Sequence, residues 1–314
     1  MAEIKLFYHK DGVVRLSRSL DFLKSNPIQS FLWIDLNDVD EEVENELEDF
    51  LKIYIQEEEE MIEIEMSSRY IETQDTLVVN SNFLLSNFES DPVSFILKNN
   101  ILVTVRSEEL ISFHETVKKI SANPKGYNTG ADVLVALLET RVEFDADMIE
   151  NMTHKITQLS NSLSLQEADK ELLGEIKNLQ EKTMMLRENI IDKQRTVSSM
   201  LRSDFIPKEL QPKLSMMIRD INSLVEHIKF SFDRLDYLQD TFLGYVNIEQ
   251  NKIIKIFTIV SVIFMPPTLI ASIYGMNFVA MPELSQKWGY PMAIVSMVIS
   301  SLAILWYFRR KKWL

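Results

Sequence analysis

The sequence predicts an α+β membrane protein. We expect an N-terminal α/β domain in the cytoplasm, a long helical hairpin with a stalk helix, and two C-terminal transmembrane helices. Three observations lead to this fold class. Residues 251–314 carry a net charge of +6, whereas residues 1–250 carry −20. Only 7 of the 314 residues are Gly, against an average usage of about 7%, which favours helices over turn-rich sheets. Two long uncharged runs stand near the C-terminus.

Residues 1–125 alternate strand and helix patterns. Strand-forming residues gather at 4–8 and 31–36, and residues 93–105 predict a hairpin that turns at Asn99 and Asn100. Between the first two strands and this hairpin, residues 38–54 place apolar side chains at helical spacing on an acidic background. These patterns predict a small cytoplasmic α/β domain.

Residues 126–250 predict long helices. Apolar residues recur at intervals of three and four over 134–163 and again over 172–201, which favours an antiparallel helical hairpin. The following stretch, 213–273, predicts one stalk helix about 90 Å long at about 1.5 Å per residue. Such a helix carries a change in the cytoplasmic region directly into the membrane.

Residues 251–314 predict a transmembrane domain with spans at about 253–275 and 290–308, joined by an outer loop. The uncharged runs in these spans contain 18 and 19 residues, close to the roughly 20 that cross a hydrocarbon core. Basic residues precede the first span and follow the second, as the run 309–312 shows. This bias places both termini in the cytoplasm of a cell whose inner membrane holds the protein. The mixed polar N-terminus shows no signal peptide.

Polar residues form a stripe along the first span. Their separations of 7, 3, 7 and 4 residues place them on one helical face, together with Ile254 and Met265. The stripe consists of Asn251, Thr258, Ser261, Thr268 and Ser272. It indicates a face that is wet or packed against protein, although Ser and Thr hydroxyls that bond their own helix explain such a stripe equally well. Two spans cannot enclose a pathway, so a pore requires several copies around an axis.

A short motif stands where the first span ends. It reads Tyr274, Gly275, Met276 and Asn277. Three further segments accompany it: FMPPT at 264–268, MPEL at 281–284 and WGYP at 288–291. In this combination the sequence resembles the CorA family of magnesium transport proteins, in particular its shorter, enterobacterial type. The resemblance is strongest over residues 244–314.

The resemblance implies a homopentameric channel for passive Mg²⁺ uptake, with Co²⁺ and Ni²⁺ as further candidate ions. Its selectivity filter falls on Tyr274, Gly275, Met276 and Asn277. Its pore-lining positions fall on Asn251, Ile254, Met265 and Thr268, to which the polar stripe adds Thr258. Mg²⁺ keeps its waters and prefers octahedral oxygen coordination, so uncharged amide and carbonyl oxygens suffice to recognise the hydrated ion. Glu283 in the outer loop then concentrates cations at the entrance.

The resemblance also implies gating by Mg²⁺ bound between neighbouring cytoplasmic domains. The charge of −20 on residues 1–250 fits this, because crowded carboxylates need a cation to hold them together. Two residues are expected to bind the ion. Asn277 does so in the pore, and Asp220, which follows Arg219, does so at the regulatory site. The acid that partners Asp220 is unassigned. Mg²⁺ is thus expected as both cargo and regulator, with no organic cofactor and no nucleic-acid partner.

Other function classes fit less well. Four scattered His, no HExxH, no Gly-Lys phosphate loop and no GxSxG leave no catalytic group, so we expect no enzyme. The absence of Cys removes disulfides, thiol catalysis and Cys-bound zinc. Two alternatives remain open. One is a zinc-transporting relative of the same superfamily, for which this chain offers few preferred ligands. The other is a membrane-anchored helical scaffold, which needs neither the motif nor the stripe.

Overall fold

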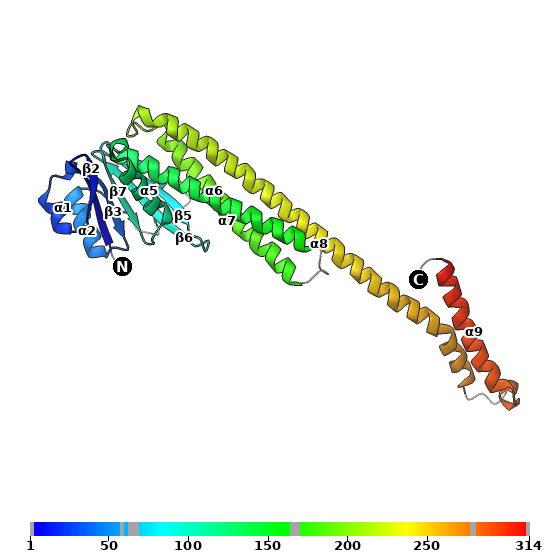
Figure 1. Cartoon of the computed structure of the whole chain (residues 1–314). Helices are drawn as coiled ribbons and strands as arrows, with labels where there is room; N and C mark the ends of the chain where they lie inside the picture. The colour runs from blue at the N-terminus through cyan, green and yellow to red at the C-terminus, as the bar shows by residue number, and fades with distance from the viewer. Residues whose placement is uncertain (1–2, 57–59, 62–68, 164–169, 277–280, 312–314) are drawn as a thin grey trace. The chain divides into compact units, whose positions relative to one another are not determined.

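The computed structural model describes residues 3–56, 60–61, 69–163, 170–276 and 281–311. The chain divides into two compact units, Met1–Gln239 and Asp240–Leu314 (Figure 1). The first unit contains a mixed β-sheet and long helices, and the second contains a helical hairpin. The predicted fold class is confirmed, because the α/β domain, the long hairpin, the stalk helix and two apolar C-terminal helices are all present. The domain boundaries expected after residues 125 and 250 stay predictions.

Seven strands of the first unit form one sheet in the order β2-β1-β3-β7-β6-β5-β4. Their bounds are β1 Glu3–Lys10, β2 Val13–Ser17, β3 Phe31–Asn37, β4 Tyr70–Glu72, β5 Thr76–Leu84, β6 Ser90–Lys98 and β7 Ile101–Arg106. Every neighbouring pair is antiparallel except β3 with β7. A parallel pair needs a long crossover. Here it runs through helix α2 (Glu41–Leu51) and strands β4 to β6.

Most of the predicted elements of the α/β domain are found in place. The strands expected at 4–8 and 31–36 are β1 and β3, and the expected hairpin is β6 with β7. Asn99 and Asn100 adopt φ of 52° and 66°, the backbone of a two-residue hairpin turn that favours Asn. The helix expected at 38–54 is α2. Strands β2, β4 and β5 lie outside the predicted runs.

Helices cover both faces of the sheet (Figure 1). Helix α1 (Leu20–Ser25) and helix α2 bury leucines on one face, where the core includes Leu23, Leu47, Ile34, Ile96 and Val103. Helix α5 (Ile111–Ala122) lies on the other face, where aromatic rings contact one another: Phe7, Trp33, Phe83, Phe95 and Phe113. Strand β3 is therefore buried on both sides.

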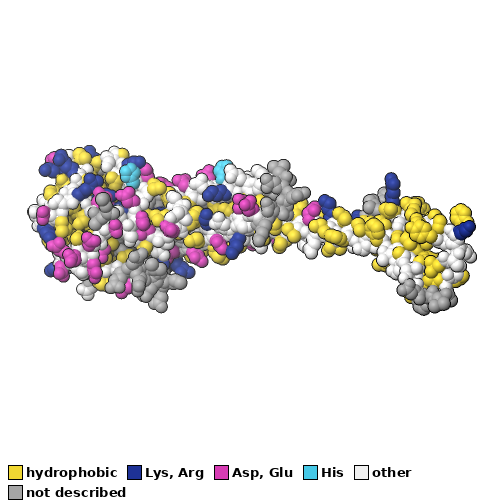
Figure 2. All heavy atoms as spheres, turned by 90° about the horizontal axis from the view of Figure 1, so that it is seen from below, with side chains coloured by type: hydrophobic (Ala, Val, Ile, Leu, Met, Phe, Trp, Pro, Cys, Tyr) yellow, Lys and Arg dark blue, Asp and Glu magenta, His cyan; other side chains and the backbone are white. Residues whose placement is uncertain are grey.

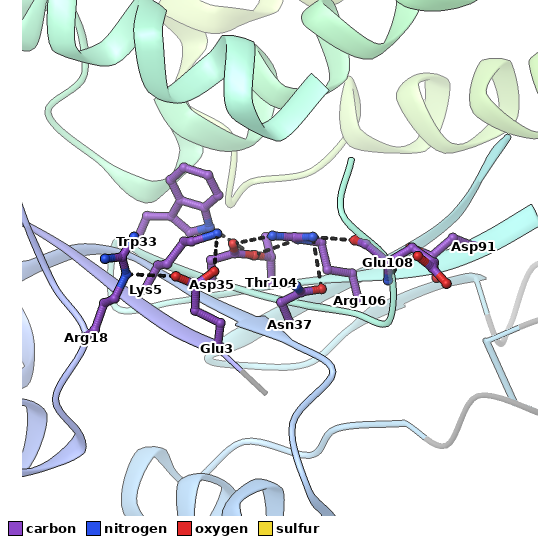
Figure 3. Close-up of polar contacts among 10 residues, drawn as sticks. All are labelled: Glu3, Lys5, Arg18, Trp33, Asp35, Asn37, Asp91, Thr104, Arg106 and Glu108. Atoms are coloured by element: carbon purple, nitrogen blue, oxygen red, sulfur yellow. Dashed lines mark hydrogen bonds and ion pairs between the residues drawn. The ribbon is translucent and has the colours of Figure 1, made fainter. Parts of the chain in front are cut away.

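A charged network is buried at the sheet (Figure 3), where Arg106 also stacks over the ring of Phe113 of α5 at 4.7 Å. Asp35 stands in the apolar run of β3 and is 1% exposed. Arg106 of β7 donates to both of its carboxylate oxygens, from Nε to Oδ1 at 3.1 Å and from Nη2 to Oδ2 at 2.8 Å. Thr104 Oγ1 donates to Oδ1 at 2.8 Å and accepts a hydrogen bond from Trp33 Nε1 at 2.9 Å. A buried charge is tolerated where it is paired and hydrogen-bonded in this way.

Two long helices and the N-terminal part of a third complete the first unit. Helices α6 (Gly130–Leu163) and α7 (Lys170–Met200) are the two expected helices, and α8 (Gln211–Tyr274) is the expected stalk. Side chains of α8 contact both partners: Arg234 donates to Thr157 of α6 at 2.9 Å, and Asp236 accepts from Gln180 of α7 at 2.8 Å. The buried face of α8 repeats every seven residues, as in Leu214, Ile221, Ile228 and Leu235. This is the seam of a coiled-coil-like bundle.

A second charged cluster joins α6 to α7. Lys193 of α7 is 1% exposed, and its Nζ lies 3.0 Å from Asp145 Oδ2 of α6. Asp145 also pairs with Arg141 at 2.6 Å, one turn earlier on α6. Asn189 accepts a hydrogen bond from Lys193 and donates to the carbonyl of Asn82 in β5. Polar contacts thus fix the helical hairpin to the sheet.

Candidate functional site

Two helices of the chain are long and apolar enough to cross a membrane: α8 and α9 (Gly289–Arg310). Within Asp240–Leu314, only Ile259 and Phe308 are buried apolar side chains outside the stalk position Phe242, counting the residues that the structure describes. Figure 2 shows hydrophobic side chains gathered over this hairpin and acidic side chains over the first unit. An apolar surface of this kind needs hydrocarbon or further protein to cover it.

The predicted pore-lining side chains occupy an exposed face of α8. Ile254 is 54% exposed and Met265 is 65% exposed. An open groove of about 440 Å³ runs along this face, lined by Ser261, Phe264, Met265, Thr268, Leu269 and Ser272. Four of these six residues belong to the predicted stripe or its apolar companions. The structure therefore gathers the polar stripe on one surface of the hairpin.

The hydroxyls of the stripe also bond their own helix. Thr258 Oγ1 donates to the carbonyl of Ile254 at 2.8 Å, and Thr268 Oγ1 donates to the carbonyl of Phe264 at 2.8 Å. This is the local bonding that offered the competing explanation of the stripe. Each bond uses the hydroxyl proton, so the oxygen lone pairs stay available as acceptors on the exposed face. The two threonines can thus present oxygens outward while their protons are held by the helix.

A proline pair interrupts the backbone bonding of α8 and is compensated by α9. Pro267 has no N–H, so the carbonyl of Ile263 lacks its usual partner four residues later. Ser301 Oγ of α9 donates to this carbonyl at 3.4 Å. A neighbouring helix commonly satisfies backbone groups that proline frees within a membrane. Sequence analysis did not identify Ser301, because nothing in the chain order shows that it faces Pro267.

The predicted filter lies where α8 ends. Tyr274 is the last helical residue, Gly275 N–H donates to the carbonyl of Ala271 at 2.9 Å, and Met276 follows in a bend. A Cβ on Gly275 would come within 3.0 Å of that same carbonyl oxygen, closer than ordinary packing allows. Asn277 lies outside the described residues. The described part of the motif is therefore the exit of the helix onto its outer loop.

The loop between α8 and α9 makes a close approach at a glycine. Glu283 is exposed in a short 3-10 turn, Pro282–Ser285, ahead of α9. A Cβ on Gly289 would stand 2.0 Å from the carbonyl oxygen of Glu283, so this close approach requires glycine. Trp288 and Tyr290 flank it, 78% and 79% exposed. Aromatic side chains at this point are typical of a membrane–water interface.

Asp220, the predicted regulatory ligand, lies on the first unit. It is exposed on α8 and lines a cavity of about 330 Å³ between α6 and α8 together with Glu139, Glu143 and Lys213. Glu143 already pairs with Lys119 at 2.7 Å. No group of three His, Cys, Asp or Glu able to hold a metal occurs among the residues that the structure describes. Within the described part of the chain, Asp220 therefore belongs to no preformed metal-binding group.

Comparison with known proteins agrees with this arrangement. The family described as CorA-like Mg²⁺ transporter protein matches residues 28–310. The chain is 39% identical to the magnesium transport protein CorA of Wolinella succinogenes over 320 residues, covering 99% of this chain and 100% of the relative. It is 34% identical to the magnesium transport protein CorA of Escherichia coli K12 over 307 residues, covering 96% and 97%.

A solved structure extends the comparison to the fold. The CorA magnesium transporter from Methanocaldococcus jannaschii superposes with a TM-score of 0.82 at 21% sequence identity, covering 100% of this chain and 99% of that one. At this identity the superposition shows a shared fold. The family match and the full-length relatives show more, and the chain belongs to the CorA-like Mg²⁺ transporter protein family.

Proposed function

We propose that the chain transports Mg²⁺ passively across the inner membrane of the cell, as a channel. The observation that carries the proposal is the exposed face of α8, on which oxygen-bearing and apolar side chains run toward Tyr274, Gly275 and Met276. Relatives that are 34% to 39% identical over nearly the whole chain are named magnesium transport proteins. These names favour Mg²⁺ over the zinc and scaffold alternatives, and transport rather than catalysis.

The chemistry of the face suits a hydrated divalent cation. Mg²⁺ dehydrates reluctantly, so neutral oxygens that bond its water shell recognise it without stripping that shell. Asn277, with the backbone carbonyls of Gly275 and Met276, is proposed to form this recognition ring. Ile254 and Met265 are apolar and exposed, and rings of such side chains exclude water from a narrow pore when it closes. Glu283 raises the local cation concentration outside the ring.

Assembly and orientation follow from the exposed surface. A hairpin of two helices leaves its apolar and polar faces uncovered, so copies must gather around an axis with α8 innermost and α9 outside. Five copies are proposed, with both termini in the cytoplasm. Positive charge supports this orientation, because Arg309 and Arg310 end α9 and Lys311 follows it, whereas the loop between the helices has Lys287 as its single basic residue.

Regulation is proposed to act through Asp220. Mg²⁺ shared between copies would neutralise carboxylates of the acidic region and stabilise the closed form, because a ligand shifts an equilibrium by its differential affinity. Millimolar Mg²⁺ should then protect the cytoplasmic helices from proteolysis relative to chelator. Asp220→Lys should lower the Mg²⁺ needed, whereas Asp49→Lys on the exposed face of α2 should not. Protection that is equal with and without Mg²⁺ would reject this sensor.

Transport is tested most directly at Asn277. Asn277→Ala should abolish Mg²⁺ uptake into proteoliposomes and growth of a transport-deficient host on low Mg²⁺, because the amide oxygen bonds the ion's water shell. Asn151→Ala removes the same amide from an exposed position of α6 and should leave uptake unchanged. Native mass should show five copies for both variants. Full uptake by the Asn277 variant, or Zn²⁺ uptake in place of Mg²⁺, would contradict the proposal.

A further inference from the structure

A basic cluster lies at the end of the hairpin away from the outer loop. We define it as Lys252, Lys255, Arg309, Arg310 and Lys311. The first two belong to α8 and the others to the end of α9. All five side chains are exposed. The cluster belongs to the second unit alone, and the proposed transport gives it no role beyond orientation.

The register of the two helices brings these cations to one level. Ser301 of α9 contacts the carbonyl of Ile263 in α8, and the chains run in opposite directions from that point. Lys255 lies eight residues before Ile263, and Arg309 lies eight residues after Ser301. At about 1.5 Å per residue each is about 12 Å from the crossing. The two cations therefore lie at similar distances along their helices from this contact.

Two buried apolar side chains lie near the cluster in the sequence. Ile259 and Phe308 are 8% and 6% exposed. Lys255 lies one helical turn before Ile259 and hence on the same side of α8, and Arg309 directly follows Phe308. Cations of the cluster thus lie next to the two covered apolar side chains of the hairpin.

Among the described residues, one carboxylate pairs with the cluster. Lys252 lies 3.5 Å from a carboxylate oxygen of Glu249, a weak exposed pair. No carboxylate pairs with the other four cations in the ranges that the structure describes. Arg310 stacks over the ring of Trp306 at 5.3 Å, which fixes its side chain and leaves its charge in place. Four cations of the cluster therefore lack a carboxylate partner in this part of the chain.

Helix dipoles account for only part of the cluster. Cations at the C-terminus of α9 are favoured by its partial negative charge. Lys252 and Lys255 stand in the interior of α8, where no helix end exists to attract them. Exposed Trp306 and Tyr307 place the cluster beside a membrane–water interface, where the phosphate groups of lipids lie. Basic groups that meet between two helices at this depth suit an anionic headgroup.

We propose that the basic cluster binds the phosphate of an anionic phospholipid, with phosphatidylglycerol as the tested ligand. The phosphodiester lies between Lys255 of α8 and Arg309 of α9, and the acyl chains follow the apolar hairpin surface. Each cation near an anionic surface is worth about fivefold in affinity, as about 1 kcal/mol converts. The bound lipid joins α9 to α8 at a second level, beyond the hydrogen bond of Ser301 to the carbonyl of Ile263. This site is independent of ion transport.

The test is lipid binding to the full chain in a neutral detergent, followed by native mass spectrometry. Dioleoyl phosphatidylglycerol should bind at least tenfold more tightly than the phosphatidylcholine with the same chains. Added sodium chloride should weaken phosphatidylglycerol binding and leave phosphatidylcholine binding unchanged, since the attraction is electrostatic. Equal binding of the two lipids by the wild-type chain would overturn the proposal without any variant.

Variants then locate the site. Lys255→Gln with Arg309→Gln should lower the preference for phosphatidylglycerol tenfold or more. Lys10→Gln with Lys125→Gln removes the same charge from exposed positions of the first unit and should keep the preference. Lys255→Arg with Arg309→Lys should also keep it, which separates lost charge from lost folding. A Gln pair that retains the preference, or a control pair that loses it, overturns the assignment.

A last arm separates lipid phosphate from free phosphate. Inorganic phosphate is compared with chloride at equal ionic strength as a competitor of phosphatidylglycerol. Equal competition by the two salts supports the lipid, because only screening acts. Displacement by millimolar phosphate alone would show a site for the free anion and overturn the lipid as ligand.

Discussion

The two units of this chain treat charge and apolar surface in opposite ways. The first unit buries ion pairs such as Asp35 with Arg106 and Asp145 with Lys193 inside its own core. The second unit exposes most of its apolar side chains and keeps its cations at the surface. The difference teaches where each unit finds its partners. The first pairs these buried charges within one chain, whereas the second leaves an apolar surface that needs hydrocarbon or further protein to cover it.

The largest expected effect breaks the core of the first unit. Asp35→Ala leaves the Arg106 guanidinium buried without its carboxylate and should cost about 3–5 kcal/mol of unfolding free energy. Chemical denaturation of the full chain in detergent measures this free energy. Tryptophan fluorescence follows the transition, and Trp33 is one of the four tryptophans that contribute to the signal. Glu115→Ala removes an exposed ion pair with Lys118 and should leave the midpoint unchanged. A loss below about 1 kcal/mol would show that Arg106 finds other partners.

The next effect concerns the outer loop of the second unit. Gly289→Ala drives a Cβ into the carbonyl of Glu283, and such overpacking costs about 1–3 kcal/mol. We expect a lower melting temperature in detergent and reduced Mg²⁺ uptake, because the loop beside the filter must shift. Gly174→Ala adds the same methyl in the interior of α7, where no atom lies within 4 Å, and should not destabilise. Equal behaviour of the two variants would contradict the close approach.

A smaller effect tests the buried lysine through pH. Burial, aided by nearby Arg141, lowers the pKa of Lys193 to about 8, although Asp145 and Asp192 oppose the shift. Below pH 8 both folded and unfolded chains carry the proton, and the cost of burying the charge is fully present. Between pH 8 and about 10.5 only the unfolded chain keeps it, so stability rises with pH, by at most about 1.4 kcal/mol per unit.

The measurement compares wild type with Lys193→Met at pH 7 and pH 9.5. The wild-type chain should gain unfolding free energy relative to the variant at the higher pH. Taking the difference between the two proteins cancels other groups that titrate in this window. Lys118→Met, at an exposed position of α5, should show no such trend. A difference that is independent of pH would mean that Lys193 keeps its proton in the fold.

The smallest effect lies between the two membrane helices. Ser301→Ala removes the donor to the Ile263 carbonyl and should cost about 0.6 kcal/mol, typical of a hydrogen bond between membrane helices. Ser300→Ala is the matched control, because its hydroxyl bonds Met297 within α9. Thermal unfolding in detergent compares them. A larger loss for the control would reject the helix–helix bond.

Much of the fold could be predicted because it rests on local patterns. Residues close together in the sequence determine each of three features: the heptad seam of α8, the asparagine turn between β6 and β7, and the uncharged spans. Strand β5 escaped prediction because its run includes Asn80, Ser81 and Asn82, which read as a loop. Their burial depends on helix α7 and on other strands, and no local pattern records those contacts.

In the candidate site too, local patterns could be predicted and contacts between distant residues could not. The positions on α8 could be predicted from spacing and resemblance, whereas Ser301 and Gly289 matter through contacts across the hairpin. A lone acid in an apolar strand, Asp35, was a signal that sequence analysis could have used, because a buried carboxylate demands a cation. Its partner Arg106 lies 71 residues away and becomes evident only from the parallel pairing of β3 with β7.

The proline pair gives α8 an unusual mechanical property. At Ile263 the helix is held by a hydroxyl of another helix in place of its own amide. The local bending stiffness of α8 therefore depends on where α9 stands, and a small outward displacement of α9 softens α8 at that level. We therefore expect lipid pressure on α9 to be transmitted to α8 through this contact. Membrane thickness and lateral tension would then act on Met265 and Thr268 without touching them.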